Sequence, residues 1–594
     1  MKRHNNDDPR KSINSVHIEE VIDESLELLY GSTEDKLKCI HNVLALCQAP
    51  GILACIIHNH QLMSALARMF GEDSHLPTDL SFAIGKLFLA FSMIRDFHEP
   101  LMSYRVGALA LGVVELELKR AWHRGNGSLP SGNKLRNEKD ESKRTDISSE
   151  VAAREYTFSK KQEQVLFVCL GILDNLADDF GVLRKMVKKS LVLVLTRCLQ
   201  QKTMQSMLVT LFMLKKASIF EETAIELSSN DCEVIAKLTC LLQLPCNAIH
   251  EEIIVVLLNL SFHDTCKKKI SSESIHLPLV KLLRKHSLRG STLQLMYNLS
   301  SSDENKQKFI KAEVSSAMLQ LIKTIPTDTY DRGLAGFLVN ITLHPLCCEE
   351  LFKLDAIAHV TSGIRESRCD EQRQVLLKVA RNLSQWTKYL QCKMHLAFVH
   401  QDLNPLIGVV KDPSCYTQMT EAGTNENAAY ASLYQDHHFW DVHIDFFLHG
   451  ALQCDSADLL VEWIGILNNL TQYDMEEGVQ LIDLLNEHCT SLVPLLHNIL
   501  HHANNSNRHA PCHDDLKLEV IIWIRELCTS TECSHWIENS NLIDDIHSTW
   551  AECSLDEEND DEMALQILSV YEQCLQHKAT RSKIIEGNGE LLAF

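Results

Sequence analysis

The sequence predicts an all-α fold, an armadillo/HEAT-like right-handed α-solenoid with a repeat of about 42 residues. Three observations lead to this prediction. Glycine and proline are scarce, with 22 and 13 in 594 residues, and the alternation of apolar and polar residues typical of strands is rare. A short phrase of the form L-x-N-L-S/T recurs along the chain. Each copy gives way to a polar turn and a new amphipathic stretch, as in LMYNLSSSDENKQKFI at 295–310.

The asparagine of each copy marks the register of the repeat. The marker residues are Asn175, Asn259, Asn298, Asn340, Asn382 and Asn469, separated by 84, 39, 42, 42 and 87 residues. The first wide gap is filled by LKKAS, which has Lys216 in the asparagine position. The second wide gap contains NAAYASLYQDHHFW, where we expect an eroded or interrupted copy.

One repeat is expected to contain a polar turn, a short helix, a helix that begins with proline and the apolar helix that carries the marker. The stretch SSDE has the form of a capping box, with Ser301 as the cap and Glu304 as its partner. The first position of a helix suits Pro278, Pro405 and Pro494, because the N–H that proline lacks would be unpaired there.

Composition divides the chain into repeats and interruptions. Stretches rich in glycine, serine and charge do not bury enough apolar surface to fold, so we read them as insertions or loops. The predicted parts are a disordered N-terminal segment (1–18), N-terminal helical repeats (19–118), a charged flexible insertion (119–161), armadillo repeats (162–411), an irregular insertion (412–440) and C-terminal armadillo repeats (441–594) with loops at 501–515 and 554–562.

The totals exclude several classes of protein. A formal net charge of −22 argues against nucleic-acid binding, which needs clustered lysine and arginine. The longest apolar stretches, such as VGALALGVV, are much shorter than the roughly 20 residues of a membrane span, and the polar N-terminus lacks a secretory signal. The 21 cysteines are scattered without a compact spacing, which is typical of reduced thiols. We therefore expect a cytoplasmic protein that does not insert into membranes.

No catalytic motif is present in the sequence. It contains no phosphate-binding glycine loop, no H-E-x-x-H, no G-x-S-x-G and no kinase signature. We therefore expect no enzymatic activity, no small-molecule substrate, no cofactor and no metal. One loop is rich in possible zinc ligands, namely His501, His502, His509, Cys512 and His513. These crowd a short polar segment without a matching pair elsewhere, so a solvated loop is the preferred interpretation.

The marker residues are the candidate binding positions. In L-x-N-L the two leucines lie three apart on one helical face and are expected to be buried, which leaves the asparagine near the edge of a groove. Its amide either bonds the end of its own helix or presents a donor and an acceptor to a bound segment. Both roles remain open for the candidate groove residues, Asn175, Lys216, Asn259, Asn298, Asn340, Asn382 and Asn469.

Several stretches outside the repeats resemble the kinesin-associated protein family, the non-motor subunits of heterotrimeric kinesin-2. They include VIDESLELLYGSTEDK, DFHEPLMSYRVGALALGVVELELKR (96–120), FSKKQEQVLFVCLGILDNLADD (158–179) and ENDDEMALQILSVYEQCLQHKATRSKII (558–585). The resemblance implies a non-catalytic adaptor that joins kinesin-2 motor tails to cargo proteins, including in intraflagellar transport. It also implies a cytoskeleton-associated location in the cytoplasm and in the cilium or flagellum.

The chain also departs from this family pattern. Family members carry a segment before the IDESLELLY region and continue beyond the point where this chain ends at GELLAF. The stretch 410–440 and the histidine-rich loop are unlike the family. We therefore expect a divergent member that is shortened at both ends.

Two other binding functions would suit a repeat array. Nuclear-import receptors of the armadillo type place a tryptophan four residues before the groove asparagine. Here those positions hold Gly171, Val255, Gln294, Gly336, Lys378 and Gly465, so this function is disfavoured. The remaining alternative is an armadillo/HEAT scaffold for another cytosolic complex, such as a phosphatase or a junctional or signalling assembly.

Overall fold

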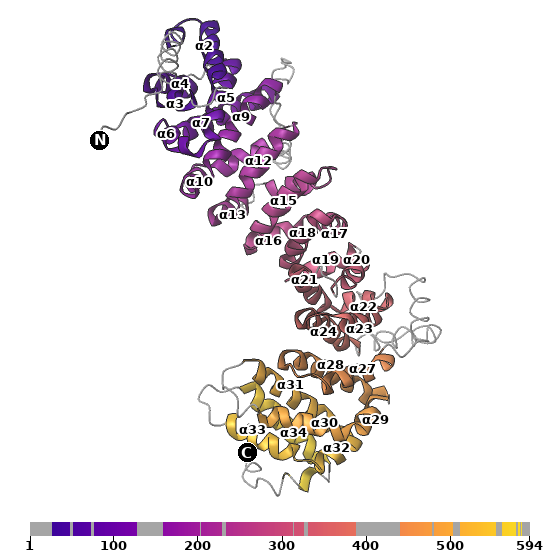
Figure 1. Ribbon diagram of the computed structural model, residues 1–594. Coiled ribbons are helices and arrows are strands. Elements are labelled where there is room, and N and C mark those ends of the chain that lie inside the picture. The colour runs from indigo at the N-terminus through magenta and orange to yellow at the C-terminus, as the bar shows by residue number, and fades with distance from the viewer. Residues whose placement is uncertain are drawn as a thin grey trace, which may run out of the picture. The chain divides into compact units, whose positions relative to one another are not determined.

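The residues that the computed structural model describes form helices and short turns and contain no strand (Figure 1). The described residues are 26–47, 52–72, 77–126, 159–201, 203–228, 233–312, 314–325, 331–387, 440–477, 480–502, 511–553, 561–577, 580–582 and 584. The predicted all-α class is confirmed. No described helix has the length and apolar character that crossing a bilayer would need.

The chain divides into two compact units, residues 1–278 and 279–594. The helices of the first unit are α2 (Thr33–Leu46), α3 (Ile52–His58), α4 (His60–Glu72), α5 (Thr78–Ser92), the 3-10 helix η1 (Arg95–Phe97), α6 (His98–Ser103), α7 (Val106–Asn126), α9 (Lys160–Leu176), α10 (Phe180–Val187), α11 (Leu191–Cys198), α12 (Met204–Ala217), α13 (Glu221–Ser228), α14 (Val234–Leu241), α15 (Asn247–Leu260) and α16 (Asp264–Ser272). Helix α17 (His276–Leu282) spans the boundary.

The second unit continues the same pattern. Its helices are α18 (His286–Leu299), α19 (Asp303–Lys311), α20 (Val314–Ile322), α21 (Arg332–Thr342), α22 (Pro345–Lys353), α23 (Ala356–Glu366), α24 (Asp370–Gln385), α27 (Asp441–Leu452), α28 (Ala457–Glu477), α29 (Gln480–Glu487), α30 (Cys489–His502), α31 (Pro511–Leu527), α32 (Thr531–Glu538), α33 (Leu542–Cys553) and α34 (Asp561–Gln576).

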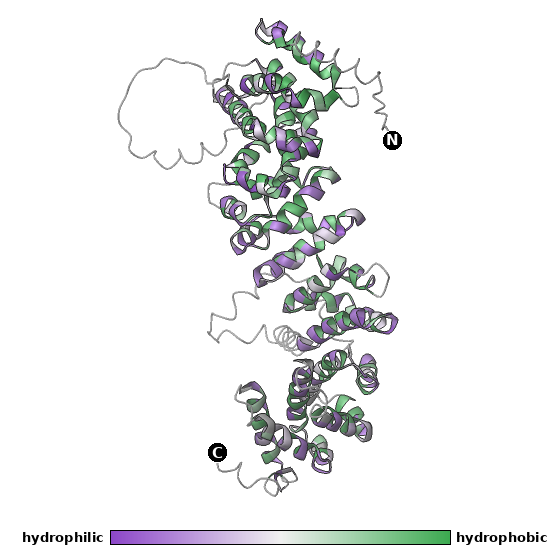
Figure 2. Ribbon diagram, turned by 60° about the vertical axis from the view of Figure 1, so that its left-hand side comes forward, coloured by the Kyte–Doolittle hydropathy of each residue, from purple (hydrophilic) through white to green (hydrophobic). Residues whose placement is uncertain are grey.

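Most repeats consist of two short helices followed by a longer one, and the longer helices stack side by side. We call these the ladder helices. In the first unit α5, α9, α12 and α15 pack in that order, and in the second unit α18, α21, α24, α28, α31 and α34 do so. Hydrophobic residues gather where the helices of a unit face one another, and hydrophilic residues cover the outer faces (Figure 2). The core of each unit is therefore a continuous layer along its ladder helices.

Polar side chains fix where several helices begin. Ser159 and Gln162 form a reciprocal capping box at the start of α9, and Asp179 caps α10 by accepting from the N–H of Val182. The expected box of Ser301 and Glu304 is wrong by one residue. Ser302 caps α19, while the hydroxyl of Ser301 donates to the carbonyl of Asn298 at 3.0 Å.

The prediction of a proline at the first helical position is wrong for Pro278 and Pro494. Pro278 is the third residue of α17, still within the first turn, where a backbone N–H has no helical partner. Pro494 lies inside α30, where its ring removes one hydrogen bond from the helix. Pro405 lies outside the described residues.

In three repeats the turn between the first and second helices ends in a residue with a left-handed backbone. These residues are Arg105, Ser190 and Asp355, with φ of 59°, 64° and 54°. They precede α7, α11 and α23 respectively. A left-handed residue turns the chain sharply within one position, so the second helix folds back on the first.

The predicted interruptions lie partly inside helices. Helix α7 continues to Asn126, with Ala121 fully buried, and α9 begins at Lys160, so both ends of the predicted insertion 119–161 are helical. Likewise α30 and α31 take up parts of the predicted loop 501–515, and α34 begins within 554–562. The segments 1–18, 127–158, 412–439, 503–510 and 554–560 lie outside the described residues.

The two wide gaps between markers have different causes. The first is filled as predicted, because α12 carries Lys216 between α9 and α15. Across the second gap α24 packs directly on α28, so no described helix stands between these two in the ladder. Residues 388–439 therefore separate two helices that are neighbours in the ladder.

Candidate functional site

Five marker asparagines link one ladder helix to the ladder helix before it. Each donates its side-chain N–H to a serine or threonine hydroxyl. The bonds are Asn175 to Ser92 at 2.9 Å, Asn259 to Ser218 at 2.8 Å, Asn340 to Ser300 at 3.1 Å, Asn382 to Thr342 at 2.9 Å and Asn469 to Ser384 at 3.0 Å.

The accepting hydroxyl explains the serine or threonine that ends the recurring phrase. It stands two residues after the marker position of the preceding copy, as Ser300 follows Asn298. Its own proton is used within its helix, for example by Ser300 for the carbonyl of Tyr297 at 2.7 Å. The hydroxyl oxygen is thereby oriented to accept the bond from the next repeat. Each copy of the phrase therefore supplies a donor to the preceding ladder helix and an acceptor to the following one.

Lys216 occupies the marker position where the preceding helix offers no hydroxyl. The residue that would accept is Ala177. Instead, the Lys216 ammonium lies 2.9 Å from carboxylate oxygens of both Asp174 and Asp178, and it donates to the carbonyl of Asp174 at 2.8 Å. In the degenerate copy the residues of both helices thus differ from those of the other repeats, and an ion pair takes the place of the neutral hydrogen bond.

The charges of this link affect one another. Burial alone would lower the pKa of Lys216, but hydrogen bonds and attraction from Asp174 and Asp178 outweigh it and raise the pKa. The hydrogen bond from Lys216, supported by its charge and those of Arg95 and His98, lowers the pKa of the Asp178 carboxyl. Both shifts favour the charged pair.

The marker residues other than Asn382 are half-buried, whereas Asn382 is only 9% exposed. Among the described residues, the side-chain oxygens of Asn175, Asn259, Asn340 and Asn469 accept no hydrogen bond, because only their N–H groups are engaged. The expectation that the amide bonds the end of its own helix is wrong for the five linked asparagines, since each bonds the neighbouring helix. Their role toward a bound segment stays a prediction.

The sequence interpretation missed the residues that receive these bonds. These are Ser92, Ser218, Ser300, Thr342 and Ser384, with Asp174 and Asp178 at the charged link. The signal was present, because a serine or threonine recurs two positions after the marker and is replaced by Ala177 just before Lys216.

In three of the repeats glycine takes the position four residues before the marker, where armadillo import receptors have tryptophan; these residues are Gly171, Gly336 and Gly465. At Gly336 an added Cβ would lie 2.7 Å from the ring of Tyr297, and at Gly465 it would lie 2.5 Å from Nε of Arg381. Tyr297 and Arg381 directly precede the markers of the preceding ladder helices. Glycine here allows a large side chain from one ladder helix to lie across the next.

Arg381 uses this space to connect three ladder helices of the second unit. From α24 its guanidinium pairs with Glu462 of α28 at 3.4 Å and with Glu519 of α31. The Glu462 side chain is only 10% exposed. A carboxylate this buried needs a cationic partner, so the arginine and the glycine belong to one packing arrangement.

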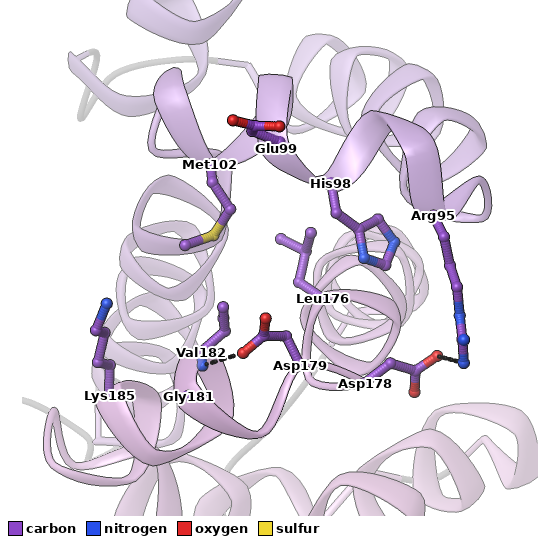
Figure 3. Close-up of a pocket in the computed structure, with 10 residues that line it drawn as sticks. All are labelled: Arg95, His98, Glu99, Met102, Leu176, Asp178, Asp179, Gly181, Val182 and Lys185. Atoms are coloured by element: carbon purple, nitrogen blue, oxygen red, sulfur yellow. Dashed lines mark hydrogen bonds and ion pairs between the residues drawn. The ribbon is translucent and has the colours of Figure 1, made fainter.

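A pocket of about 610 Å³ opens beside the link between α5 and α9 (Figure 3). It lies between α6 and the α9–α10 turn and is lined by Arg95, His98, Glu99, Met102, Leu176, Asp178, Asp179, Gly181, Val182 and Lys185. In Figure 3 Arg95 and Asp178 form an ion pair at one side, 3.8 Å apart, and Lys185 stands at the other.

The chemistry of the pocket suits binding of a mixed-charge segment. The lining contains cationic, anionic and apolar side chains but no serine, threonine or cysteine to act as a nucleophile. His98 is engaged through Nε2 by the carbonyl of Ser92 at 2.8 Å, and Asp179 is engaged as the cap of α10. The pocket therefore offers side chains of both charges near the ends of the ladder helices α5 and α9.

Comparison with known protein families gives one match over nearly the whole chain. The model described as kinesin-associated protein (KAP) matches residues 4–413 and 438–590. The unmatched residues 414–437 fall within the stretch 410–440 that looked unlike this family, whereas the histidine-rich loop falls within the matched range.

Solved structures support the fold class. A chain from work on the phosphorylation switch that controls the interaction between cadherin and beta-catenin covers 96% of this chain and 99% of its own length, with a TM-score of 0.58 and 13% identity. A designed armadillo repeat protein covers 38% of this chain and 95% of its own length, with a TM-score of 0.33 and 16% identity. The match with a TM-score of 0.58 supports the predicted fold, an armadillo-type α-solenoid.

Proposed function

The chain belongs to the kinesin-associated protein family, and on that premise we propose that it is the non-catalytic adaptor subunit of a heterotrimeric kinesin-2 motor. In this function it binds the coiled-coil and tail regions of the paired motor subunits and joins them to cargo proteins. The transport is microtubule-based and includes intraflagellar transport, so the protein acts in the cytoplasm on the cytoskeleton and in the cilium. The family match over nearly the whole chain is the observation that carries the proposal.

The candidate groove residues support binding of an extended or helical partner segment. The half-buried asparagines of each unit use their N–H groups for the link to the preceding helix and leave an oxygen that can accept. An array of acceptors suits a partner that presents backbone N–H groups or basic side chains. The formal net charge of −22 also favours a basic partner segment.

The experiment is co-elution of the full chain with a dimer of kinesin-2 coiled-coil and tail fragments at physiological salt. Stable 1:1:1 co-elution is the expected result. A helical, well-folded chain that fails to co-elute with the motor fragments would remove the motor link and favour a scaffold for another cytosolic complex.

A matched pair of variants separates binding from stability at one groove residue. Asn340→Ala removes both the link to Ser300 and the acceptor offered to a partner, whereas Ser300→Ala removes the link and the bond to the carbonyl of Tyr297 but keeps that acceptor. Both variants are expected to lose about 1 kcal/mol of stability. Only Asn340→Ala is expected to weaken motor binding, by about fivefold. Equal binding by the two variants would limit Asn340 to a structural role.

A further inference from the structure

The second unit contains a cluster of possible metal ligands that the proposed function does not use. Asp445 and His449 lie one turn apart on α27, and His488 lies between α29 and α30. One ligand atom from each of the three lies within 4.8 Å of those from the other two. No other group of three such side chains meets this spacing in the part of the chain that the structure describes.

The three side chains already approach one another as ligands of one ion would. Nδ1 of His449 lies 3.0 Å from Oδ1 of Asp445 and 2.9 Å from the main-chain carbonyl oxygen of the same residue. The rings of His449 and His488 meet edge to face, with centroids 5.2 Å apart and an interplanar angle of 78°. Two ligands of a tetrahedral zinc ion stand about 3.4 Å apart when the bonds are about 2.1 Å. Small side-chain rotations therefore suffice to bring the third ligand into range.

The backbone holds the cluster in place from two sides. On α27 the buried Ile444, Phe447 and Leu448 face the core, which leaves Asp445 and His449 together on the outer side. The N–H of His488 donates to the carbonyl of Leu484 at 3.1 Å, so this residue continues the last turn of α29. Helix α27 packs against both α29 and α30.

We propose that Asp445, His449 and His488 bind a divalent transition-metal ion of the zinc type. Two imidazole nitrogens and one carboxylate oxygen form a ligand set that suits Zn²⁺ or Co²⁺ and is too rich in nitrogen for Mg²⁺ or Ca²⁺. Asp445 and His449 supply two ligands from one helical face, and His488 supplies the third from the next repeat. The fourth position is open to water or to a partner side chain.

The metal would act as a clamp between successive repeats. Helix α27 precedes the ladder helix α28, whereas His488 belongs to the repeat that follows it. An ion that binds only the folded state stabilises that state by an amount that grows with the logarithm of the free metal concentration above the Kd, so the metal would tie the two repeats together. The site differs from the histidine-rich loop considered on sequence grounds, and the proposal departs from the expectation that the chain binds no metal.

The test is a Co²⁺ titration of the full chain after treatment with a chelator, in a reductant that does not bind metal. Wild-type protein is expected to take up one equivalent with the visible absorption of four-coordinate cobalt. The double variant His449→Gln with His488→Gln is expected to lose that equivalent. A sulfur-to-cobalt band in the near ultraviolet would report any binding by cysteines separately.

A second pair of histidines provides the matched control. His497 and His501 stack on α30, with ring centroids 5.3 Å apart, and His497 also lies 2.6 Å from Asp545. The variant His497→Gln with His501→Gln should keep the equivalent, and Zn²⁺ should raise its melting temperature as it does that of wild type. The proposal is overturned if wild type takes up no cobalt, if the His449 and His488 variant keeps its equivalent, or if only the control variant loses it. Circular dichroism at matched temperature shows that each variant is folded.

Discussion

Two links between ladder helices occupy the same position of the repeat and use different chemistry. Between α21 and α24 the link is neutral and buried, because Asn382 donates to Thr342 and to the carbonyl of Val339. Between α9 and α12 it is charged and partly exposed, because Lys216 pairs with two aspartates. The preceding helix decides which link forms, by offering a hydroxyl in one case and carboxylates in the other. The side chains at the end of one ladder helix therefore match the marker residue of the next ladder helix.

The neutral link is expected to show the largest effect when it is broken. Asn382→Ala removes two hydrogen bonds, of 2.9 Å and 3.0 Å, in a place where water does not replace them, since Thr342 is fully buried. We expect the free energy of local unfolding of α21 and α24 to fall by about 2–3 kcal/mol. Hydrogen exchange of the amides in 331–387 measures this quantity.

The control for this variant is Asn340→Ala. Asn340 is half-buried and donates a single bond of 3.1 Å, so about 1 kcal/mol is expected. An equal loss at both positions would mean that burial does not set the strength of these links.

The sequence predicted the class of fold and the place of the links better than their nature. Periodic spacing located all seven marker residues on ladder helices, including Lys216 in the degenerate copy. It did not show which helices are neighbours across 388–439, because spacing along the chain does not distinguish a missing helix from an insertion. It also did not show that the amide bonds the neighbouring helix, because that bond depends on the packing of two repeats.

Side-chain clusters between repeats were beyond sequence analysis for the same reason. Asp445 and His449 are recognisable as a helical pair, but His488 stands 39 residues after His449 and joins them only through packing. Gly465 and Arg381 are 84 residues apart, and nothing in the linear pattern connects them.

Ladder helices pack closely at both kinds of link. Gly465 belongs to neither kind of link, so a substitution there tests the contribution of close packing alone. Gly465→Ala places a Cβ about 2.5 Å from Nε of Arg381, whose guanidinium is held by Glu462 and Glu519. Because the arginine cannot move without losing these carboxylates, we expect a loss of about 1–2 kcal/mol. Urea denaturation followed by circular dichroism measures the change in midpoint.

Gly112→Ala is the matched helix substitution. Gly112 is exposed, and its added Cβ would meet no atom within 4 Å. Alanine should therefore raise stability there by about 0.5–1 kcal/mol through helix propensity alone. A loss at Gly112 similar to that at Gly465 would show that the contact with Arg381 is not the cause.

An exchange of residues tests whether a neutral link between an asparagine and a serine can replace the charged link of Lys216. Lys216→Asn alone should cost about 1 kcal/mol, because the new amide faces Ala177 instead of a hydroxyl. Adding Ala177→Ser should recover most of this loss. The backbone of Ala177 (φ −73°, ψ −2°) is close to that of Ser300 (φ −69°, ψ −1°), so a serine there can present its hydroxyl in the same direction.

A double-mutant cycle on thermal midpoints measures the coupling between the two substitutions. We expect Lys216→Asn to cost about 0.5–1 kcal/mol less in the Ala177→Ser background than in wild type. Additive effects of the two changes would contradict the expectation that the introduced amide and the introduced hydroxyl form a hydrogen bond with each other.

The smallest expected effect is a difference in pH dependence between the stability contributed by the charged link and that contributed by the neutral link. Because the pKa of Asp178 is lowered below its ordinary 3.8, the charged link adds stability above about pH 4 and loses it as the pH falls through the folded-state pKa. Because the pKa of Lys216 is raised above 10.5, the same stability lasts until the pH rises past that value. The advantage of wild type over Lys216→Met should therefore be present at pH 7 and should be smaller at pH 3, which lies below the ordinary pKa of an aspartate.

Solvent screening keeps this advantage small, because the Lys216 and Asp178 side chains are 29% and 43% exposed. We expect about 0.2–1 kcal/mol, reduced further by high salt. The loss caused by Asn382→Ala should stay constant between the same two pH values, since neither Asn382 nor Thr342 titrates. Hydrogen exchange of 160–217 and 331–387 at both pH values compares the two links directly. A pH-independent loss at Lys216 would show that its alkyl chain, and not its charge, joins α12 to α9.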